Sequence, residues 1–484
     1  MLRSTRGVAL VTLALINVFT LAAGVTLVRV LPNRLAMLKP VRVADRGDVQ
    51  ASPVLGPVSD PVSGPLSSTA SGGPTSSGLD SALAGALSTS ALGSGVAAVV
   101  ADESGRVVWS RNPGQLGAPA STEKVATAVA ALDVLGPDAH FTTKVVSGPG
   151  NSIVLVGGGD PTLAAGAPPL SDYPQPATLQ ALAAQAAKAL KTAHRSQVQL
   201  GYDASLYTGP GLAPGWPETY VTTGDVTSIT SLEVDQGRLT PSGTPEDADD
   251  PVNYRARSTD PAAMAAESFG DFLTADGITV TGQPSTATAS SGAATLGSVS
   301  SPPLSAIVEQ MLLESNNVIA ENLARHVALA TNHPASFAGA AAAETAVLGR
   351  LGVKTGFQLV DGSGLSPQDK IAPAALVQLL ALAASPQHPT LRAVITGLPV
   401  AGFAGTLSPG DSVFGDIGGS ARGVVRAKTG NLSTVAALAG LVYDRDGRVL
   451  VFAFDADSVA AAGLQSAADA LNDAAAALAS CGCR

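Results

Sequence analysis

The sequence predicts an α+β fold with one antiparallel sheet that takes strands from both ends of the folded chain. Residues 95–100 and 106–109 are short apolar runs around an Asp-Glu-Ser-Gly turn, a pattern typical of a β-hairpin. Residues 435–443 and 448–454 repeat the pattern around Asp-Arg-Asp-Gly. Since roughly 400 residues follow the N-terminal region, more than one core is expected.

Each predicted hairpin is followed by a helix. Residues 121–135 are rich in Ala and Val, which favours a buried helix, and the Ala-rich stretch from Ser458 onward repeats leucine every seven positions. Between them, residues 146–299 have strand and turn signals of their own. We therefore expect a main domain formed by residues 79–145 and 300–484, with one or two inserted domains at 146–299.

The N-terminal region predicts a membrane segment and a tether. Residues 8–28 carry no charge and are long enough, as a helix, to span about 30 Å of hydrocarbon. This is longer than the apolar region of a cleaved signal peptide, which favours a retained anchor after a cytoplasmic stub at 1–7; cleavage near residues 22–24 is the alternative. Residues 29–78, rich in Pro, Ser and Gly from residue 47 onward, are expected to be a linker.

Charge and composition exclude several functions. A net charge of −10 and a pI near 5.0 argue against a nucleic-acid partner. The histidines lack metal-ligand spacing and no Gly-x-Ser-x-Gly is present, so neither a metal site nor a Ser/His/Asp triad is predicted. Cys481 and Cys483 are expected to lie in an exposed tail, with a local or an intermolecular disulfide as the alternatives.

The most informative pattern is Ser121-Thr-Glu-Lys124. Residues three apart on a helix share one face, so the serine hydroxyl and the lysine amine can meet. A serine is a weak nucleophile until a neighbouring base takes its proton, and a partly neutral lysine can do so. Only Lys124 among the lysines of the chain has a serine three positions before it. Glu123, between the pair, is expected on a solvated face.

Two further motifs follow in the order that this chemistry requires. Ser315-Asn-Asn317 matches Ser-x-Asn, and Lys428-Thr429-Gly430 matches Lys-Thr-Gly. Each has a competitor elsewhere in the chain. Residues 110–112 match Ser-x-Asn but precede Ser121 and are expected in a loop. Residues 354–356 match Lys-Thr-Gly but lack the strand pattern that follows Gly430, so Lys354 is expected to be a surface lysine.

On these motifs the chain resembles the D-alanyl-D-alanine carboxypeptidase/endopeptidase family, the class C low-molecular-weight penicillin-binding proteins of the penicillin-binding protein 4 type. The resemblance covers about residues 90–480 and implies a penicillin-binding/β-lactamase-like transpeptidase fold, an antiparallel sheet flanked by helices. Further segments resemble family blocks in family order: 155–163, 201–205, 320–322, 361–366, 398–402 and 405–407.

The resemblance implies an activity and a role for each motif residue. Ser121 would form an acyl-enzyme with the stem peptide of peptidoglycan, Lys124 would be the general base, and Lys428 would help to lower the pKa of Lys124. Ser315 would pass a proton to the leaving amine and Asn317 would position Lys124 and the substrate amide. Lys428 and Thr429 would receive the substrate carboxylate. Gly430, between Thr429 and Asn431, would also belong to the substrate-binding residues. The backbone N–H groups of Ser121 and Asn431 would form the oxyanion hole.

The implied enzyme is a serine-type D-Ala-D-Ala carboxypeptidase and DD-endopeptidase that needs no cofactor or metal and is acylated by β-lactam antibiotics. It would lie outside the cytoplasm, anchored by the N-terminal segment or secreted after cleavage. The alternatives are a serine β-lactamase and a non-catalytic cell-wall-binding relative. We assign no chemical role to residues 361–366, which are expected to form a turn.

Overall fold

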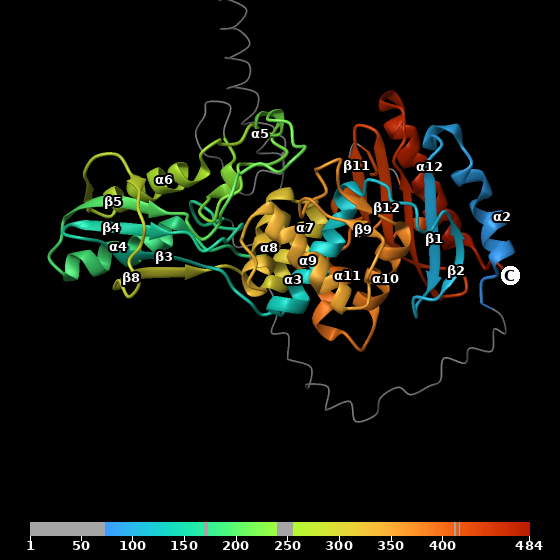
Figure 1. Cartoon of the computed structure of the whole chain (residues 1–484), viewed down its shortest axis with the longest axis horizontal. Helices are drawn as coiled ribbons and strands as arrows, with labels where there is room; N and C mark the ends of the chain where they lie inside the picture. Colours follow the sequence, from blue (N-terminus) through green and yellow to red (C-terminus); the bar gives the residue numbers. More distant parts are fainter. Residues whose placement is uncertain (1–72, 169–172, 240–254, 411–412, 416) are drawn as a thin grey trace, which may run out of the picture. The chain divides into compact units, whose positions relative to one another are not determined.

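The computed structural model describes residues 73–168, 173–239, 255–410, 413–415 and 417–484 (Figure 1). The predicted stub at 1–7, the membrane segment at 8–28 and most of the linker at 29–78 lie outside these residues. Helix α2 (Ser76–Leu87) begins inside the predicted linker because the Thr75 side chain accepts a hydrogen bond from Gly78 N and caps it. No helix in the described part has both the length and the apolar character needed to cross a membrane.

The main sheet joins the two ends of the folded chain, as predicted. Its five strands run in the order β11-β12-β13-β1-β2, and every neighbouring pair is antiparallel. The central contact pairs β1 with β13 from Val96–Ala456 to Asp102–Leu450. The bounds are β1 Val96–Asp102, β2 Val107–Arg111, β11 Val425–Leu432, β12 Val435–Tyr443 and β13 Val449–Ala456.

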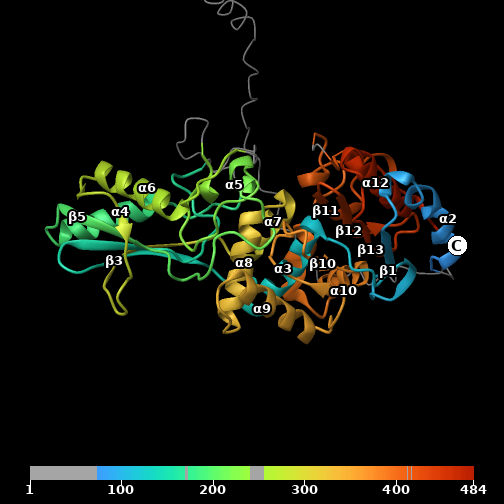
Figure 2. The same ribbon diagram turned by 45° about the horizontal axis from the view of Figure 1, so that its top comes forward.

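Helices cover both faces of this sheet (Figure 2). Since side chains alternate along a strand, Val99 and Ala101 belong to one core and Val100 to the other. The Val100 face packs against α2 and α12 (Leu464–Ser480), which begins six residues later than predicted, after Gly463. The opposite face packs against an all-helical layer, which consists of α3 Lys124–Leu135, α7 Leu304–Glu314, α8 Asn317–Ala330, α9 Phe337–Arg350, α10 Pro373–Ala384 and α11 Arg392–Thr396.

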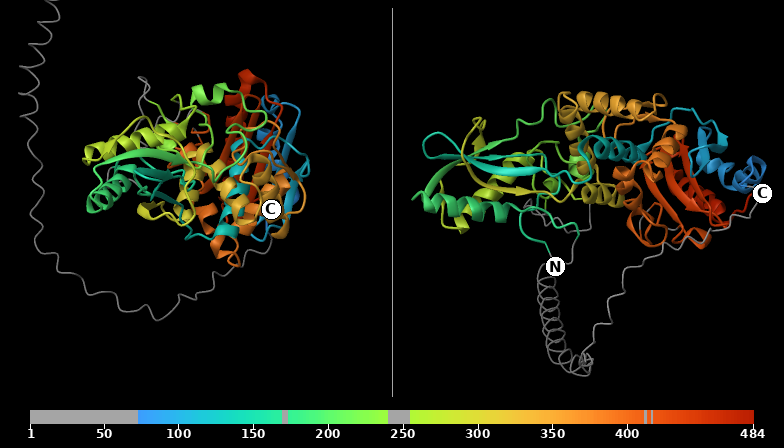
Figure 3. Two further views of the ribbon diagram at one scale, coloured as in Figure 1. Left: turned by 60° about the vertical axis from the view of Figure 1, so that its left-hand side comes forward. Right: turned by 90° about the horizontal axis from the view of Figure 1, so that it is seen from below.

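A second sheet occupies the predicted insertion (Figure 3). Its order is β6-β5-β4-β3-β8, with β7 also paired to β5, and α4 (Leu179–Thr192) and α6 (Pro261–Ala275) share its core. The predicted boundaries at 145/146 and 299/300 fall inside two strands that pair with each other, β3 and β8. The bounds are β3 Thr142–Ser147, β4 Ser152–Val156, β5 Gln197–Asp203, β6 Thr279–Val280, β7 Ser285–Thr286 and β8 Thr295–Ser300.

Residues 213–226, which include the short helix α5 (Thr219–Thr223), leave the second sheet and pack on the helical layer. Trp216 and Val226 of this segment share a small core with Val318 of α8 and Phe337 of α9. A two-stranded ribbon of β9 (Phe357–Gln358) and β10 (Lys370–Ile371) flanks the loop that lies between them in sequence.

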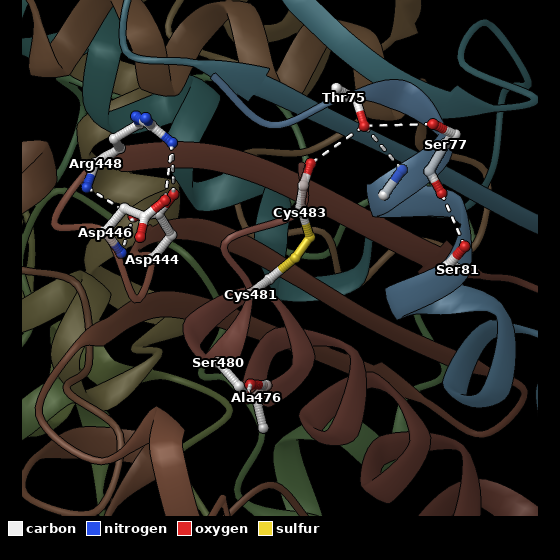
Figure 4. The surroundings of a disulfide bond; sticks show 11 residues. Thr75, Ser77, Ser81, Asp444, Asp446, Arg448, Ala476, Ser480, Cys481 and Cys483 are labelled. Atoms are coloured by element: carbon white, nitrogen blue, oxygen red, sulfur yellow. Dashed lines mark hydrogen bonds and ion pairs between the residues drawn. A yellow bond between two sulfur atoms is a disulfide. The ribbon is translucent and has the colours of Figure 1, made fainter. Parts of the chain in front are cut away.

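The C-terminal tail is tied down rather than exposed and loose. Cys481 and Cys483 form the local disulfide that was one of the alternatives (Figure 4). The Cys483 carbonyl accepts hydrogen bonds from Thr75 N at 2.6 Å and Thr75 Oγ1 at 3.2 Å, so the tail contacts the residue that caps α2.

Candidate active site

Ser121 and Lys124 meet, although the local helix is not the one predicted. Residues Ala120–Glu123 form a 3₁₀ turn (η2), and α3 begins only at Lys124. In a 3₁₀ helix the side chains at i and i+3 eclipse each other, so the spacing argument still holds. The distance from Lys124 Nζ to Ser121 Oγ is 2.8 Å.

Lys124 is completely buried and has three polar neighbours at its amine. Besides Ser121 Oγ, Nζ donates to Asn317 Oδ1 at 2.7 Å and to the Ser363 carbonyl oxygen at 2.8 Å. A neutral amine has two hydrogens and one lone pair. With its two N–H groups donated to Asn317 Oδ1 and Ser363 O, the lone pair faces the hydroxyl of Ser121, which is the arrangement that a general base needs.

Burial lowers the pKa of Lys124 to about 8, and the nearby carboxyl groups of Asp361, Glu321 and Glu123 act in the opposite direction. The further lowering of this pKa that was expected from Lys428 stays a prediction, because burial is the largest cause. Loss of hydration destabilises the ammonium form by itself, so no second cation is required.

The second motif lies in the turn between α7 and α8. Ser315 ends α7 in the left-handed region, with φ of 58°, and Asn316 caps α8 by accepting from Ile319 N. This tight turn directs Ser315 and Asn317 toward the nucleophile. Asn317 Nδ2 donates to the Asp225 carbonyl oxygen at 2.8 Å while its Oδ1 accepts from Lys124.

The third motif lies on β11, as predicted. Lys428 is completely buried and donates to Ser315 Oγ at 2.8 Å, which joins the second and third motifs. A Cβ atom on Gly430 would lie 2.7 Å from the Pro119 carbonyl oxygen, so glycine allows the strand to approach the nucleophile turn. The competitor Lys354 is exposed, as expected. In the competing Ser-x-Asn match at residues 110–112, Ser110 lies on β2 rather than in the predicted loop.

A cleft opens in front of these residues. It brings together the predicted residues Ser121, Ser315, Asn317, Thr429 and Asn431, whereas Lys124, Lys428 and Gly430 lie behind its lining. The lining residues that the sequence analysis did not identify are Gly224, Asp225, Arg257, Glu314, Asn316, Leu365, Thr406 and Val413. Thr406 places its hydroxyl 2.7 Å from that of Thr429, so two hydroxyl groups lie together at this wall of the cleft.

The Asp361–Ser366 loop, to which no chemical role was assigned from the sequence, contributes to the site. The Asp361 carboxylate accepts hydrogen bonds from Ser363 N at 3.0 Å, Gly364 N at 2.7 Å and Ser366 N at 2.7 Å. An Asp that bonds the amides following it is a turn signal, and this signal was present in Asp-Gly-Ser-Gly. The sequence could not show that the folded loop presents the Ser363 carbonyl to Lys124.

Glu123 is buried, so the prediction of a solvated face was wrong. The 3₁₀ turn directs its side chain inward, where neither carboxylate oxygen has a hydrogen-bond partner among the described residues. Burial raises the pKa of Glu123 well above its usual value, and the charges of Asp369 and Asp361 raise it further. We therefore read Glu123 as a neutral carboxylic acid at neutral pH.

Glu123, Asp361 and Asp369 each bring one oxygen to within 4.8 Å of the others, a spacing that could hold a metal ion. However, four N–H groups already occupy the Asp361 carboxylate, three from the backbone and one from Trp216. Burial, followed by the charge of Asp361, raises the pKa of Asp369 to about 10. Protons shared among carboxyl groups therefore fit this cluster better than a cation.

Comparisons with known proteins indicate the family of the chain. Residues 79–256 and 242–478 match the model of the D-Ala-D-Ala carboxypeptidase 3 (S13) family. A carboxypeptidase of Mycobacterium tuberculosis is 39% identical over 373 residues, which are 76% of this chain and 77% of that protein. A D-alanyl-D-alanine carboxypeptidase of Actinomadura sp. is 31% identical over 429 residues, covering 74% and 76% of the two chains.

Among solved structures, penicillin-binding protein 4 from Haemophilus influenzae has the same fold, with a TM-score of 0.65 at 23% identity over 81% of this chain and 98% of that one. The fold and the Ser–Lys pair thus define a serine hydrolase with the α+β penicillin-binding fold. Within this class, the chain belongs to the D-Ala-D-Ala carboxypeptidase 3 (S13) family of serine peptidases, as the resemblance implied.

Proposed function

We propose that Ser121 is the acylating nucleophile of this D-Ala-D-Ala carboxypeptidase and that Lys124 is its general base. The observation that carries the proposal is the 2.8 Å contact between Lys124 Nζ and Ser121 Oγ. The same amine donates hydrogen bonds to Asn317 Oδ1 and Ser363 O. When the amine is neutral, these two bonds use both of its hydrogens, and its lone pair is directed at the serine hydroxyl.

Acylation then proceeds in two steps. Ser121 Oγ forms a bond to the carbonyl carbon between the two D-alanines of a stem peptide, and its proton passes to Lys124. The tetrahedral intermediate carries an oxyanion, for which the backbone N–H groups of Ser121 and Asn431 are the donors. When the C–N bond breaks, the leaving D-alanine amine takes a proton through Ser315, whose hydroxyl is held by Lys428.

The acyl-enzyme is released when water attacks the ester carbonyl and Ser121 recovers a proton through Lys124. We assign the terminal carboxylate of the substrate to Thr429 and Lys428, with the Thr406 hydroxyl beside them. The carboxylate of a β-lactam would occupy the same position, so β-lactams acylate Ser121 as substrate analogues. No step requires a metal or a cofactor.

We further propose that the enzyme cuts peptide cross-links as an endopeptidase, because a cross-link presents the same D-alanyl amide bond. We also propose an extracytoplasmic location with attachment to the membrane through residues 8–28. The uncharged length of that segment and the location of peptidoglycan outside the membrane support this proposal.

The proposal is tested with residues 73–484 and a fluorescent penicillin, followed by release of D-alanine from a pentapeptide and cleavage of cross-linked muropeptide dimers. A stable adduct that is lost in Ser121→Ala and Lys428→Ala and retained in Lys354→Ala supports it. Rapid turnover of penicillin would instead indicate a β-lactamase, and absence of label a non-catalytic relative. Labelling that depended on Lys354 rather than Lys428 would contradict the assignment of the third motif.

A further inference from the structure

We infer that the 213–226 segment positions the amine of Lys124, through Trp216 and the backbone carbonyl of Asp225. The inference rests on the proposed role of Lys124 as general base. It assigns to a segment outside all three motifs the task of keeping the lone pair of the amine directed at Ser121.

The first contact acts on the Asn317 side chain. An amide has a donor end and an acceptor end, and only the acceptor end suits an amine that donates to it. The Asp225 carbonyl accepts from Asn317 Nδ2 at 2.8 Å, which holds Asn317 Oδ1 toward Lys124 Nζ at 2.7 Å. Without the carbonyl of Asp225, the amide would be free to turn its NH₂ group toward the lysine.

The second contact acts on the loop that supplies the other acceptor. Trp216 Nε1 donates to Asp361 Oδ2 at 2.6 Å, and the same carboxylate binds three backbone N–H groups of the loop. Ser366 Oγ of this loop donates in turn to the Pro214 carbonyl at 2.9 Å. The loop that carries Ser363 is therefore bonded twice to the 213–226 segment.

The segment is rigid enough to act in this way. Trp216 is 7% exposed, and its ring packs edge-on against Phe337 with 5.3 Å between the ring centroids. Val226 and Val318 complete the same small core, so both contacts start from a packed element rather than from a free loop. The two acceptors of the Lys124 amine thus depend on one short stretch of chain.

Trp216 also influences charge, because its N–H partly neutralises the Asp361 carboxylate. Asp361 is the first of the carboxyl groups that favour the ammonium form of Lys124. The other titratable and charged groups that act on Lys124 or on Asp361 come from the nucleophile turn, α5, α8, α9 and the loop. They are Glu123, Tyr220, Glu321, Arg325, Glu344 and Asp369. Loss of the indole N–H should therefore change the pH at which Lys124 deprotonates.

The chain offers a matched control, because it has only two tryptophans and both donate to an aspartate. Trp109, on β2, donates Nε1 to Asp80 Oδ1 at 3.3 Å and is 5% exposed. Trp216→Phe and Trp109→Phe remove the same atoms, but only the first removes a contact to the Asp361 loop. Acylation by fluorescent penicillin is measured for both between pH 6.5 and 9.5, together with the thermal unfolding midpoint.

We expect Trp216→Phe to slow acylation at pH 7.5 by about 10- to 100-fold, the scale of a small misplacement of a catalytic group. The midpoint of its pH–rate profile should shift, while Trp109→Phe keeps both the rate and the midpoint. The inference is wrong if Trp216→Phe acylates at the rate of the parent protein. It is also wrong if acylation slows only in proportion to the drop in the thermal unfolding midpoint and the midpoint of the pH–rate profile does not change.

If Trp216→Phe does not fold, Ser366→Ala tests the second bond between the loop and the segment, and a several-fold slower acylation is expected. An unchanged rate there would count against the inference. Absence of labelling in the parent protein would contradict the proposed function itself. Normal labelling in both the parent protein and Trp216→Phe would contradict only the inference about the segment.

Discussion

The state of Lys124 gives the most quantitative prediction: acylation should accelerate with pH through about 8. A general base must be neutral, and burial places the pKa of Lys124 at about 8 rather than near 10.5. From that value about one-tenth of the lysine is neutral at pH 7 and about nine-tenths at pH 9. The second-order rate constant for penicillin should therefore rise roughly tenfold between these pH values.

The sign follows from which form reacts. Above the pKa the amine has lost its third proton, and its lone pair can accept the proton of Ser121; below it, Nζ can only donate to Ser121 Oγ. A group that had to be protonated would give the opposite slope. The assay is stopped-flow or gel-based labelling from pH 6.5 to 9.5, with circular dichroism at each pH to show that the fold is retained.

Two variants control this measurement. Ser121→Ala reports non-specific labelling at each pH. Lys124→Arg keeps a cation that does not deprotonate in this range, so its labelling should stay at background at every pH. A rate that is flat or falls between pH 7 and 9, or a profile that survives in Lys124→Arg, would refute the assignment of Lys124 as base.

Two other predictions concern buried contacts of the nucleophile turn. Gly364→Ala should reduce acylation by at least about tenfold, since its Cβ would overlap the Ala120 carbonyl oxygen. The control is Gly447→Ala, which has a nearly identical φ (78° against 77°) and no atom within 4 Å of the new Cβ, so it should cost only backbone strain of about 1–2 kcal/mol in urea unfolding. Equal losses of acylation in the two variants would contradict this prediction. Glu123→Gln should raise the free energy of unfolding at pH 7.5 and not at pH 4.5. The Glu123 carboxyl of the unfolded chain ionises above about pH 4.5, whereas the buried carboxyl of the folded protein stays protonated, so the parent protein loses stability as the pH rises. An equal difference in free energy of unfolding between variant and parent at both pH values would show that Glu123 is not a buried neutral acid.

The sequence was sufficient where local pattern determines the outcome. The strands of the main sheet were predictable because apolar runs on both sides of an Asp-rich turn are typical of a hairpin, and strands from both ends of the chain share one sheet as expected. The choice of Lys428 over Lys354 succeeded for a similar reason. Only the former is followed by a strand long enough to lie beside the nucleophile turn.

The sequence was not sufficient where the outcome depends on which elements meet. The expectation for Glu123 failed because a helical wheel shows its neighbours in the same helix but not α8, α9 or the Asp361 loop on the other side. The motifs likewise suggest only a nearby charge as an influence on Lys124. The packed structure shows that burial is the largest cause of its lowered pKa.

Buried acids around a lysine that must lose its proton present an apparent conflict, since negative charge would stabilise the ammonium form. The structure resolves it by keeping most of these groups neutral: burial raises the pKa of Glu123 and Glu344 well above their usual values and that of Glu321 to about 8. Asp361 has a structural part as well, because its carboxylate accepts four N–H groups and thereby orders the loop. Lys124 can therefore lie next to a dense group of carboxyls and still serve as a base, provided that the protons of those carboxyls are retained.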